Sequence, residues 1–279
     1  MIQRIEKKWD LPLNHLFLVS QLYAKPNLIS PHTPIIRDQL EHYRLETAQS
    51  RADLKEVFKL RNRVFFEELQ GRSKPLALEI DEFDFRCTHL MIRETATGKT
   101  VGTYRLLPST QTNRFYSESE FDLSELLSKP GIKLELGRAC IDQNHRNGTV
   151  LALLWRGISQ MMKETRAEIL FGCSSVPSLD PMVIESLSFE MERMKAFEEH
   201  LQIHSRGEFP RSSPLIRPIL PSSESPTLPP LIRSYLLSGA KVGREPFYDF
   251  DFQCVDFFTL LELKNLSPAF RRRYFSWLT

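Results

Sequence analysis

Apolar and polar residues alternate or recur at helical spacing along much of the chain, and these periods predict its strands and helices. A strand is predicted from Tyr43 to Ala48 and a helix from about Ala52 to Glu68. Apolar residues recur in that helix with a near-helical period: Leu54, Val57, Phe58, Val64, Phe65 and Leu69. The runs Thr88 to Arg93 and Thr100 to Leu107 flank a glycine turn, so they predict a β-hairpin.

The spacing of apolar residues also predicts the strands and helices in the middle of the chain. A strand from Leu134 to Ile141 is followed by a polar turn and by a helix that begins near Thr149. The apolar positions of this helix form a stripe typical of a core-facing surface: Val150, Leu151, Leu154, Ile158, Met161 and Met162. A strand from Ile169 to Ser174 and a helix from about Pro181 to Leu201 are predicted next.

Residues 207–230 hold seven of the 18 prolines, interleaved with serines, and predict an extended connection. A short helix from Leu231 to Leu237, capped by Gly239, is expected after it. Strands from Ala240 to Val242 and from Gln253 to Leu261 then precede a terminal helix. This order of elements predicts an α/β fold, a mixed sheet with helices on both faces, in one domain over residues 43–279.

Residues 1–42 form an N-terminal extension whose scattered prolines argue against a long helix. Its apolar residues suit either a flap that docks on the core or a contact with lipid. The run from Leu16 to Val19 is too short and too polar in its surroundings for a signal peptide, and no stretch reaches the roughly 20 apolar residues of a membrane span. We therefore expect a cytoplasmic protein, with peripheral contact to the inner face of the membrane left open.

Composition adds little to this picture. The chain of 279 residues is 41% hydrophobic and 26% charged, and its formal charge of +2 is too small to indicate a nucleic-acid partner. The four cysteines are far apart and form no C-x-x-C pair, which argues against a zinc site or a disulfide framework: Cys87, Cys140, Cys173 and Cys254. No metal is expected. The basic run from Arg271 to Arg273 fits a solvated helix end or a contact with an anionic membrane.

The first candidate chemistry lies on the strand that contains Glu135 and Arg138. Side chains three apart on a regular strand point to opposite faces, but Gly137 between them is typical of a bulge that re-aims its neighbours. We therefore predict a bulged strand that brings the acid and the base towards one cleft. The following helix begins close by, and its N-terminus is able to hold a phosphate.

A second group of candidates is an acidic loop and four arginines. Glu79, Asp81 and Asp84 lie within six residues just before a predicted strand. Such a loop is often only solvated, but carboxylates so close together also bind cations or act as bases. Four arginines occur in apolar contexts where a guanidinium needs a partner: Arg61, Arg63, Arg105 and Arg138. Ion pairs between the two groups are expected to organise a cleft.

Two further features have a structural and a functional interpretation. His89 lies on a predicted strand, as a structural histidine or as a catalytic base. The turn from Arg146 through Asn147 and Gly148 to Thr149 resembles the pantetheine-pyrophosphate loop of acyl-CoA-using acetyltransferases. It departs from their pattern because Thr149 and Leu151 occupy the two glycine positions, and Thr149 also fits a simple helix N-cap.

Taken together, these features are similar in order and spacing to the signature of acyl-homoserine-lactone synthases. The residues that carry this similarity are Arg61, Phe65, Glu79, Asp81, Asp84, Arg105, Glu135 and Arg138. The chain resembles more closely the ornithine-acyl-carrier-protein N-acyltransferases of ornithine-lipid synthesis and the long-chain N-acyl amino acid synthases. That resemblance rests on residues 60–65 with Glu68, 87–90, 102–107, 135–138, 154–158, 229–231, 235–236, 239–240 and 256–257.

The resemblance covers about residues 43–275 and implies a GCN5-related N-acyltransferase (GNAT) fold with a mixed, mostly antiparallel sheet. It implies transfer of a fatty acyl group from acyl carrier protein to the amine of an amino acid, the first step towards an aminolipid or N-acyl amino acid. The 4′-phosphopantetheine arm of the donor would lie between two splayed strands, and no separate cofactor is implied. Asn62, where these relatives often carry an aromatic residue, leaves the acceptor open.

The roles of individual residues follow from the same resemblance. Glu135 is the first candidate for the base that deprotonates the amine, with His89 and Glu79 behind it. The backbone near Gly137 would stabilise the oxyanion. Six residues would bind substrate: Arg61, Phe65, Asp81, Asp84, Arg105 and Arg138. The phosphopantetheine would contact Arg146, Asn147, Gly148 and Thr149.

Two alternative functions remain open. The first is synthesis of an acyl-homoserine lactone from S-adenosylmethionine. The second is a non-catalytic module that binds an acyl chain or its carrier protein, in which the acidic and basic residues only pair.

Overall fold

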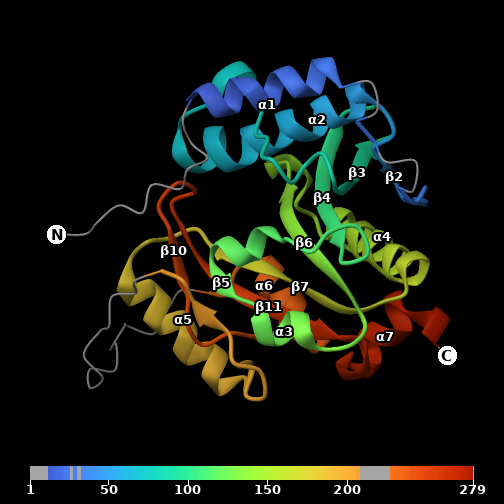
Figure 1. The fold of residues 1–279 in the computed structure, drawn as a ribbon. Coiled ribbons are helices and arrows are strands. Elements are labelled where there is room, and N and C mark those ends of the chain that lie inside the picture. The colour runs from blue at the N-terminus through green and yellow to red at the C-terminus, as the bar shows by residue number, and fades with distance from the viewer. Residues whose placement is uncertain (1–11, 26–27, 30–32, 208–226, 279) are drawn as a thin grey trace. The chain divides into compact units, whose positions relative to one another are not determined.

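The computed structural model describes residues 12–25, 28–29, 33–207 and 227–278. The chain divides into two compact units, and Figure 1 shows the elements of both. Unit 1 comprises Met1–Leu107 and Gly137–Glu164, and unit 2 comprises Pro108–Leu136 and Thr165–Thr279. Most of the proline-rich connection predicted at residues 207–230 lies outside the described residues.

Unit 1 is built on an antiparallel sheet. Its strands are β1 (Arg37–Leu40), β2 (Tyr43–Thr47), β3 (Thr88–Glu94) and β4 (Thr100–Pro108), each paired with the next. The second half of β6 (Ile132–Ile141) continues the strand order beside β4. The predicted hairpin and the predicted first strand are confirmed, whereas β1 was not anticipated.

Helix α4 (Thr149–Thr165) packs tightly on the sheet of unit 1. A Cβ atom added to Gly157 would lie 2.8 Å from Leu90 and 2.9 Å from Leu45, so only glycine permits this approach. The predicted apolar stripe of the helix is confirmed, since Val150, Leu154 and other members of the stripe are buried.

Helix α2 (Arg51–Asn62) begins at a capping box, in which the Ser50 hydroxyl accepts from the Asp53 backbone N–H and the Asp53 carboxylate accepts from the Ser50 N–H. Residues Arg63–Glu68 continue it as a π-helix. The helix predicted over residues 52–68 is therefore confirmed, with a change of hydrogen-bond pattern in its last turns. π-Helical segments in α-helices frequently occur at functional sites.

Helix α1 (Pro12–Ala24) was not anticipated in the N-terminal region. The prolines were expected to forbid a long helix, and this helix of 13 residues is compatible with them, because Pro12 stands at the first helical position, where a missing N–H costs nothing. The helix packs on α2, where Val19 and Leu22 join a buried cluster with Leu54 and Phe58. Figure 1 shows α1 running alongside α2.

Unit 2 contains the mixed part of the sheet. The first half of β6 pairs in parallel with β7 (Ala167–Val176), which pairs antiparallel with β11 (Cys254–Glu262). Strand β11 also pairs with β10 (Phe247–Asp249) and with β9 (Lys241–Val242). Two short strands, β5 (Phe121–Asp122) and β8 (His204–Ser205), form a separate ribbon.

The parallel ladder of unit 2 ends at the pair Leu136 and Gly172, although β7 continues to Val176. The two backbones approach closely at this point, because a Cβ atom on Gly172 would lie 2.2 Å from the Leu136 carbonyl oxygen. The ladder therefore stops one residue before Gly137, where a bulge was predicted.

Helices α3 (Ser124–Ser128), α5 (Pro181–Arg193), α6 (Pro230–Ser238) and α7 (Pro268–Tyr274) complete unit 2. The helix predicted up to Leu201 ends at Arg193, because Lys195 adopts a positive φ of 53° and the Ala196 carbonyl bonds to the Val242 N–H. Helix α6 ends at Gly239 in the left-handed conformation, as predicted.

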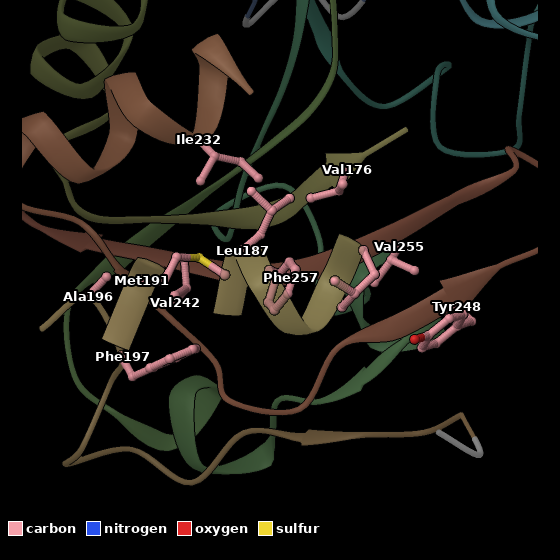
Figure 2. Packing of buried hydrophobic residues seen from close by; sticks show 11 residues of the cluster. Val176, Leu187, Met191, Ala196, Phe197, Ile232, Val242, Tyr248, Val255 and Phe257 are labelled. Carbon is pink, nitrogen blue, oxygen red and sulfur yellow. The ribbon is translucent and has the colours of Figure 1, made fainter. Parts of the chain in front are cut away.

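Figure 2 shows the core of unit 2. Helix α5 contributes Leu187 and Met191, and β11 contributes Val255 and Phe257. The four side chains are at most 1% exposed, so helix α5 covers this face of β11. Within the described residues of both units, no helix has both the length and the apolar character needed to cross a bilayer.

Candidate active site

A buried network of ion pairs in unit 1 brings together seven of the predicted site residues. Arg61, at the end of α2, is fully buried and donates to Glu79 and Asp84. Its Nη1 and Nη2 lie 2.6 and 3.0 Å from the two carboxylate oxygens of Asp84, a bidentate arrangement. The acidic loop is therefore not a solvated loop.

Two further arginines close the network. Nη1 of Arg105, on β4, lies 2.6 and 2.7 Å from the oxygens of Asp81 and 3.1 Å from Asp84. Arg138, on β6, donates to Glu79 over 3.1 Å and to Asp81 over 2.9 Å. Three guanidinium groups thus face three carboxylates, and the network is formally neutral.

The acidic loop is held in place by its own hydrogen bonds. The Glu79 N–H donates to the Phe58 carbonyl, and the Asp81 N–H donates to the Asp84 carboxylate over 2.8 Å. Asp81 in turn accepts from the Phe83 N–H. These local bonds leave the three carboxylates on one side of the loop, available to the arginines.

The backbone at Arg138 is strained. Its φ is 53°, in the left-handed region that non-glycine residues rarely adopt, whereas Gly137 does not have a positive φ. The predicted irregularity in the strand is present, but its unusual residue is Arg138 and not the glycine. The ion pairs to Glu79 and Asp81 hold this side chain and stabilise the strained conformation.

The electrostatics of the network follow from its burial and its charges. Burial raises the pKa of the Asp84 carboxyl, but the guanidinium groups of Arg61 and Arg105 outweigh it and hold that pKa well below the usual range. Burial lowers the pKa of Arg61, and the carboxylates of Asp84 and Glu79 more than reverse this effect. Asp84 and Arg61 therefore both stay charged at neutral pH.

His89, on β3, packs against this network. Its Nε2 lies 3.0 Å from the Asp84 carbonyl, and its ring meets the Phe58 ring edge-on. Burial, reinforced by the positive charge of Arg61, lowers the pKa of His89 to about 4. The imidazole is therefore neutral at pH 7, and its Nδ1 has no hydrogen-bond partner among the described residues.

Only two members of the network have appreciable solvent access. The side chains of Asp81 and Arg138 are 20% and 11% exposed, whereas the other charged members are 5% exposed or less. A polar molecule from solvent would therefore meet the pair Asp81 and Arg138 first.

Arg63 does not join the network, contrary to the expectation that grouped it with the other arginines. Its Nη1 lies 2.9 Å from Asp142, which also accepts from Lys99. Phe65, in the π-helix, packs against a small cluster with Leu60 and Val64.

Glu135, the first candidate for the base, lies in unit 2. Its carboxylate is buried and accepts from the Tyr116 N–H, the Ser117 N–H and the Ser117 hydroxyl over 2.7–3.1 Å. These donors were not anticipated, because residues so far apart carry no common spacing. Arg138, three residues later, bonds to the acidic loop of unit 1.

The turn before α4 has the geometry of a capped helix start. Gly148 has a φ of 87°, and Thr149 is the first residue of the helix. The Thr149 N–H donates to the side-chain oxygen of Asn147 over 3.1 Å, so Asn147 and not Thr149 supplies the capping oxygen. Arg146 pairs with Glu68, and Thr149 donates to Glu41. The suggestion that Thr149 acts as N-cap is therefore wrong.

Three buried carboxylates of unit 2 also lie together, a grouping that the sequence did not indicate. Glu120, Asp249 and Asp256 each offer an oxygen, and these atoms lie within 4.8 Å of one another. Carboxylate oxygens at this spacing have the donor chemistry that hard cations prefer. The three residues come from distant parts of the chain, so no motif could have indicated them.

Comparison with known proteins identifies the family. Residues 60–156 match the family described as an acetyltransferase (GNAT) domain. The chain is 31% identical over 272 residues to the L-ornithine N(alpha)-acyltransferase of Rhizobium meliloti (strain 1021), with 91% of each chain covered. It is 30% identical over 261 residues to that of Brucella abortus (strain 2308), covering 86% of this chain and 91% of the relative.

More distant similarities involve related synthases. An acyl-homoserine-lactone synthase of Vibrio anguillarum is 35% identical over 100 residues, 34% of this chain and half of the relative. Among solved structures, the acyl-homoserine-lactone synthase LasI gives a TM-score of 0.47 at 15% identity, covering 88% and 96% of the two chains. FeeM, an N-acyl amino acid synthase from uncultured soil microbes, gives 0.45 at 9% identity, covering 85% and 98%.

The expected family and fold class are thus confirmed. The mixed, mostly antiparallel sheet with its helices is an α/β fold of the GNAT type. The chain belongs to the family of L-ornithine N(alpha)-acyltransferases, and it is an N-acyltransferase that transfers an acyl group to an amine.

Proposed function

We propose that this enzyme transfers a fatty acyl group from the thioester of acyl carrier protein to the α-amine of ornithine or a similar amino acid. The product is an N-acyl amino acid, the first intermediate of an aminolipid. The reaction takes place in the cytoplasm, at the inner face of the membrane. The observation that carries this proposal is the ion-pair network of unit 1, whose partly exposed members are one acid and one base.

The pair Asp81 and Arg138 matches the two charges of a free amino acid. The guanidinium of Arg138 is suited to the acceptor carboxylate, and the carboxylate of Asp81 is suited to its ammonium group. Arg105 and Asp84 hold this pair from the buried side. The acceptor can bind without a net charge being buried, because each of its charges meets an opposite one.

The acceptor amine must lose a proton before it attacks the thioester carbonyl, so the reaction needs a base. Glu135 stays the first candidate, because its carboxylate is held in one orientation by Ser117 and Tyr116. His89 is second, since it is neutral at pH 7 and has an acceptor nitrogen at Nδ1. Glu79 is third, because its oxygens pair with two charged groups, Arg61 and Arg138, whereas the donors to Glu135 are uncharged.

The donor would be bound through its phosphopantetheine arm at the turn before α4. Nothing lies within 4 Å of the position a Gly148 Cβ would occupy, which leaves room above the turn. The helix that follows has 17 residues, and its N-terminus favours a phosphate. Arg146 lies beside the turn, with its guanidinium paired to Glu68 and about half exposed. The phosphopantetheine belongs to the donor substrate, so the proposal includes no separate cofactor.

The decisive experiment supplies the purified enzyme with acyl-acyl carrier protein and a panel of amines. Formation of N-acyl ornithine, detected by mass spectrometry, supports the proposal. A homoserine lactone formed from S-adenosylmethionine would replace it with the first alternative function. Failure to consume thioester with any amine would favour the non-catalytic binding module. The same assay with acyl-CoA tests whether the carrier protein is required.

Variants then test the acceptor site and the base. Arg138→Lys and Asp81→Asn should raise KM for ornithine by about tenfold or more, because each loses a charge-assisted bond worth about 1.5–3 kcal/mol. The surface variant Arg156→Lys is the matched control. Glu135→Gln should lower kcat without weakening binding of the carrier protein, and unchanged turnover would remove Glu135 from the role of base.

A further inference from the structure

The outer face of helix α1 in unit 1 is apolar although it is exposed to solvent. None of the residues Pro12–Ala24 is charged. His15, Val19 and Leu22 are buried on the inner face, whereas Leu16, Phe17 and Tyr23 are 47%, 60% and 50% exposed.

These exposed residues form one surface and are not scattered. At about 100° per residue, Leu16, Phe17 and Tyr23 fall within an arc of about 120°, together with exposed Ser20 and Ala24. A helix that borders water normally carries charged side chains on that face, and a helix without them is normally covered. We call this surface the α1 face.

Basic residues border the C-terminal end of the α1 face. Nζ of Lys55 lies 5.8 Å from the centre of the Tyr23 ring, and Arg51 donates to the carbonyl of Lys25 over 2.8 Å. Within the described part of the chain, no carboxylate lies within ion-pair distance of Lys25, Arg51 or Lys55. An apolar strip bordered by uncompensated cations is complementary to the surface of an anionic bilayer.

The 3-10 turn next to α1 carries a further exposed apolar side chain. His15 on α1 bonds through Nε2 to the Leu78 carbonyl over 2.8 Å, which joins the helix to the segment Pro75–Ala77. Leu76 in this segment is 67% exposed. The helix is about 20 Å long at 1.5 Å per residue, too short for a hydrocarbon core of about 30 Å, so it can only lie along a surface.

We propose that the α1 face docks on an anionic phospholipid bilayer, with Leu16 and Phe17 inserted at the level of the headgroups and Lys25, Arg51 and Lys55 against the phosphates. The inference rests on the proposed function in one respect. An amino acid that carries a fatty acyl amide is an amphiphile that partitions into a membrane, so an enzyme docked there can release its product directly into the bilayer. A second copy of the chain and the acidic carrier protein are the competing occupants of this face.

Vesicle co-sedimentation of the full chain tests the proposal. The unmodified protein should sediment with vesicles that contain phosphatidylglycerol, bind at least tenfold less to pure phosphatidylcholine vesicles, and dissociate as salt is raised. Leu16→Ser with Phe17→Ser should reduce binding at least tenfold, and so should Lys25→Glu with Lys55→Glu. Phe189→Ser, which changes a 51% exposed phenylalanine on α5, is the matched control and should bind normally.

A second variant avoids any effect on folding. Phe17→Trp should show a blue-shifted fluorescence emission when anionic vesicles are added, because the indole enters a less polar environment. Equal binding by the serine double variant, or emission that does not shift, would overturn the proposal. If the unmodified protein forms a dimer without vesicles and the serine double variant does not, the α1 face binds a second copy of the chain instead.

Turnover separates the docking surface from the proposed function. In the absence of vesicles, both double variants should consume acyl-acyl carrier protein at the unmodified rate. If the unmodified protein turns over its substrates but does not bind anionic vesicles, the docking surface is refuted and the enzyme activity stands. Loss of carrier-protein turnover in the serine variant, with its thermal unfolding unchanged, would identify the carrier protein as the occupant.

Discussion

The buried position of Asp84 makes its charge a sensitive test of the ion-pair network. Asp84→Asn keeps the shape of the side chain and removes one negative charge. The carboxylate accepts from Arg61 at 2.6 and 3.0 Å and from Arg105 at 3.1 Å, and its side chain is completely buried. The substitution leaves the formally neutral network with a net charge of +1.

The expected loss of stability is large, because a buried charge without compensation costs about 3–5 kcal/mol. In a protein of this size, that loss corresponds to a decrease in Tm of about 10 °C. Asp38→Asn is the matched control, because Asp38 forms a partly exposed pair with Arg156 at 3.5 Å. Such a surface pair contributes at most about 1 kcal/mol.

Thermal and urea unfolding of both variants measure the difference. A third variant tests the reasoning about charge: Arg61→Gln combined with Asp84→Asn restores a neutral network. Because the two residues are in contact, the double variant should be less destabilised than the sum of the single variants. Equal losses for Asp84→Asn and Asp38→Asn, or strictly additive losses in the double variant, would refute the account of a charge-balanced network.

Three further predictions follow from the structure. The pKa of His89 is about 4 in the folded protein against 6.5 for the free side chain, so between these values only the unfolded chain binds this proton. The free energy of unfolding therefore falls as the pH decreases through that window, by about 3 kcal/mol at 1.36 kcal/mol per pKa unit. Urea unfolding at pH 7.5 and pH 5 should show a smaller loss in His89→Gln. Gly172→Ala should lose more than 2 kcal/mol, since its Cβ would lie 2.2 Å from the Leu136 carbonyl oxygen, whereas Gly243→Ala, with its nearest neighbour at 3.4 Å, should be tolerated. Leu22→Ala should cost about 2–5 kcal/mol in the same measurement, because this fully buried side chain anchors α1.

Much of the fold was predictable because its periods are local. The strands β2, β3, β4 and β7 and the helices α2, α4 and α6 lie where alternation, helical spacing and a terminal glycine placed them. Helix α1 was not anticipated because the prolines were weighed only as limits on a long helix, and a proline at the first position permits a short one. The end of α5 was misplaced because the turn at Lys195 depends on a bond to β9, which is distant in sequence.

The candidate site was predictable in composition but not in pairing. The apolar surroundings of Arg61, Arg105 and Arg138 indicated that each needed a carboxylate, and the acidic loop offered three carboxylates. Nothing local showed that Arg63 would bond to Asp142, or that Glu135 would be held by Ser117. Each of these partners lies 18 or more residues away along the chain.

The sequence by itself determined the order of elements, the family, and the charged groups that have to be neutralised. Those properties depend on residue type and on spacing within a few residues. Only the tertiary structure decided which carboxylate meets which arginine, that Arg138 takes the strained conformation in β6, and that Glu120, Asp249 and Asp256 converge. The physical reason is that ion pairs depend on distances of a few ångströms between segments that the sheet brings together, and local periodicity carries no information about such distances.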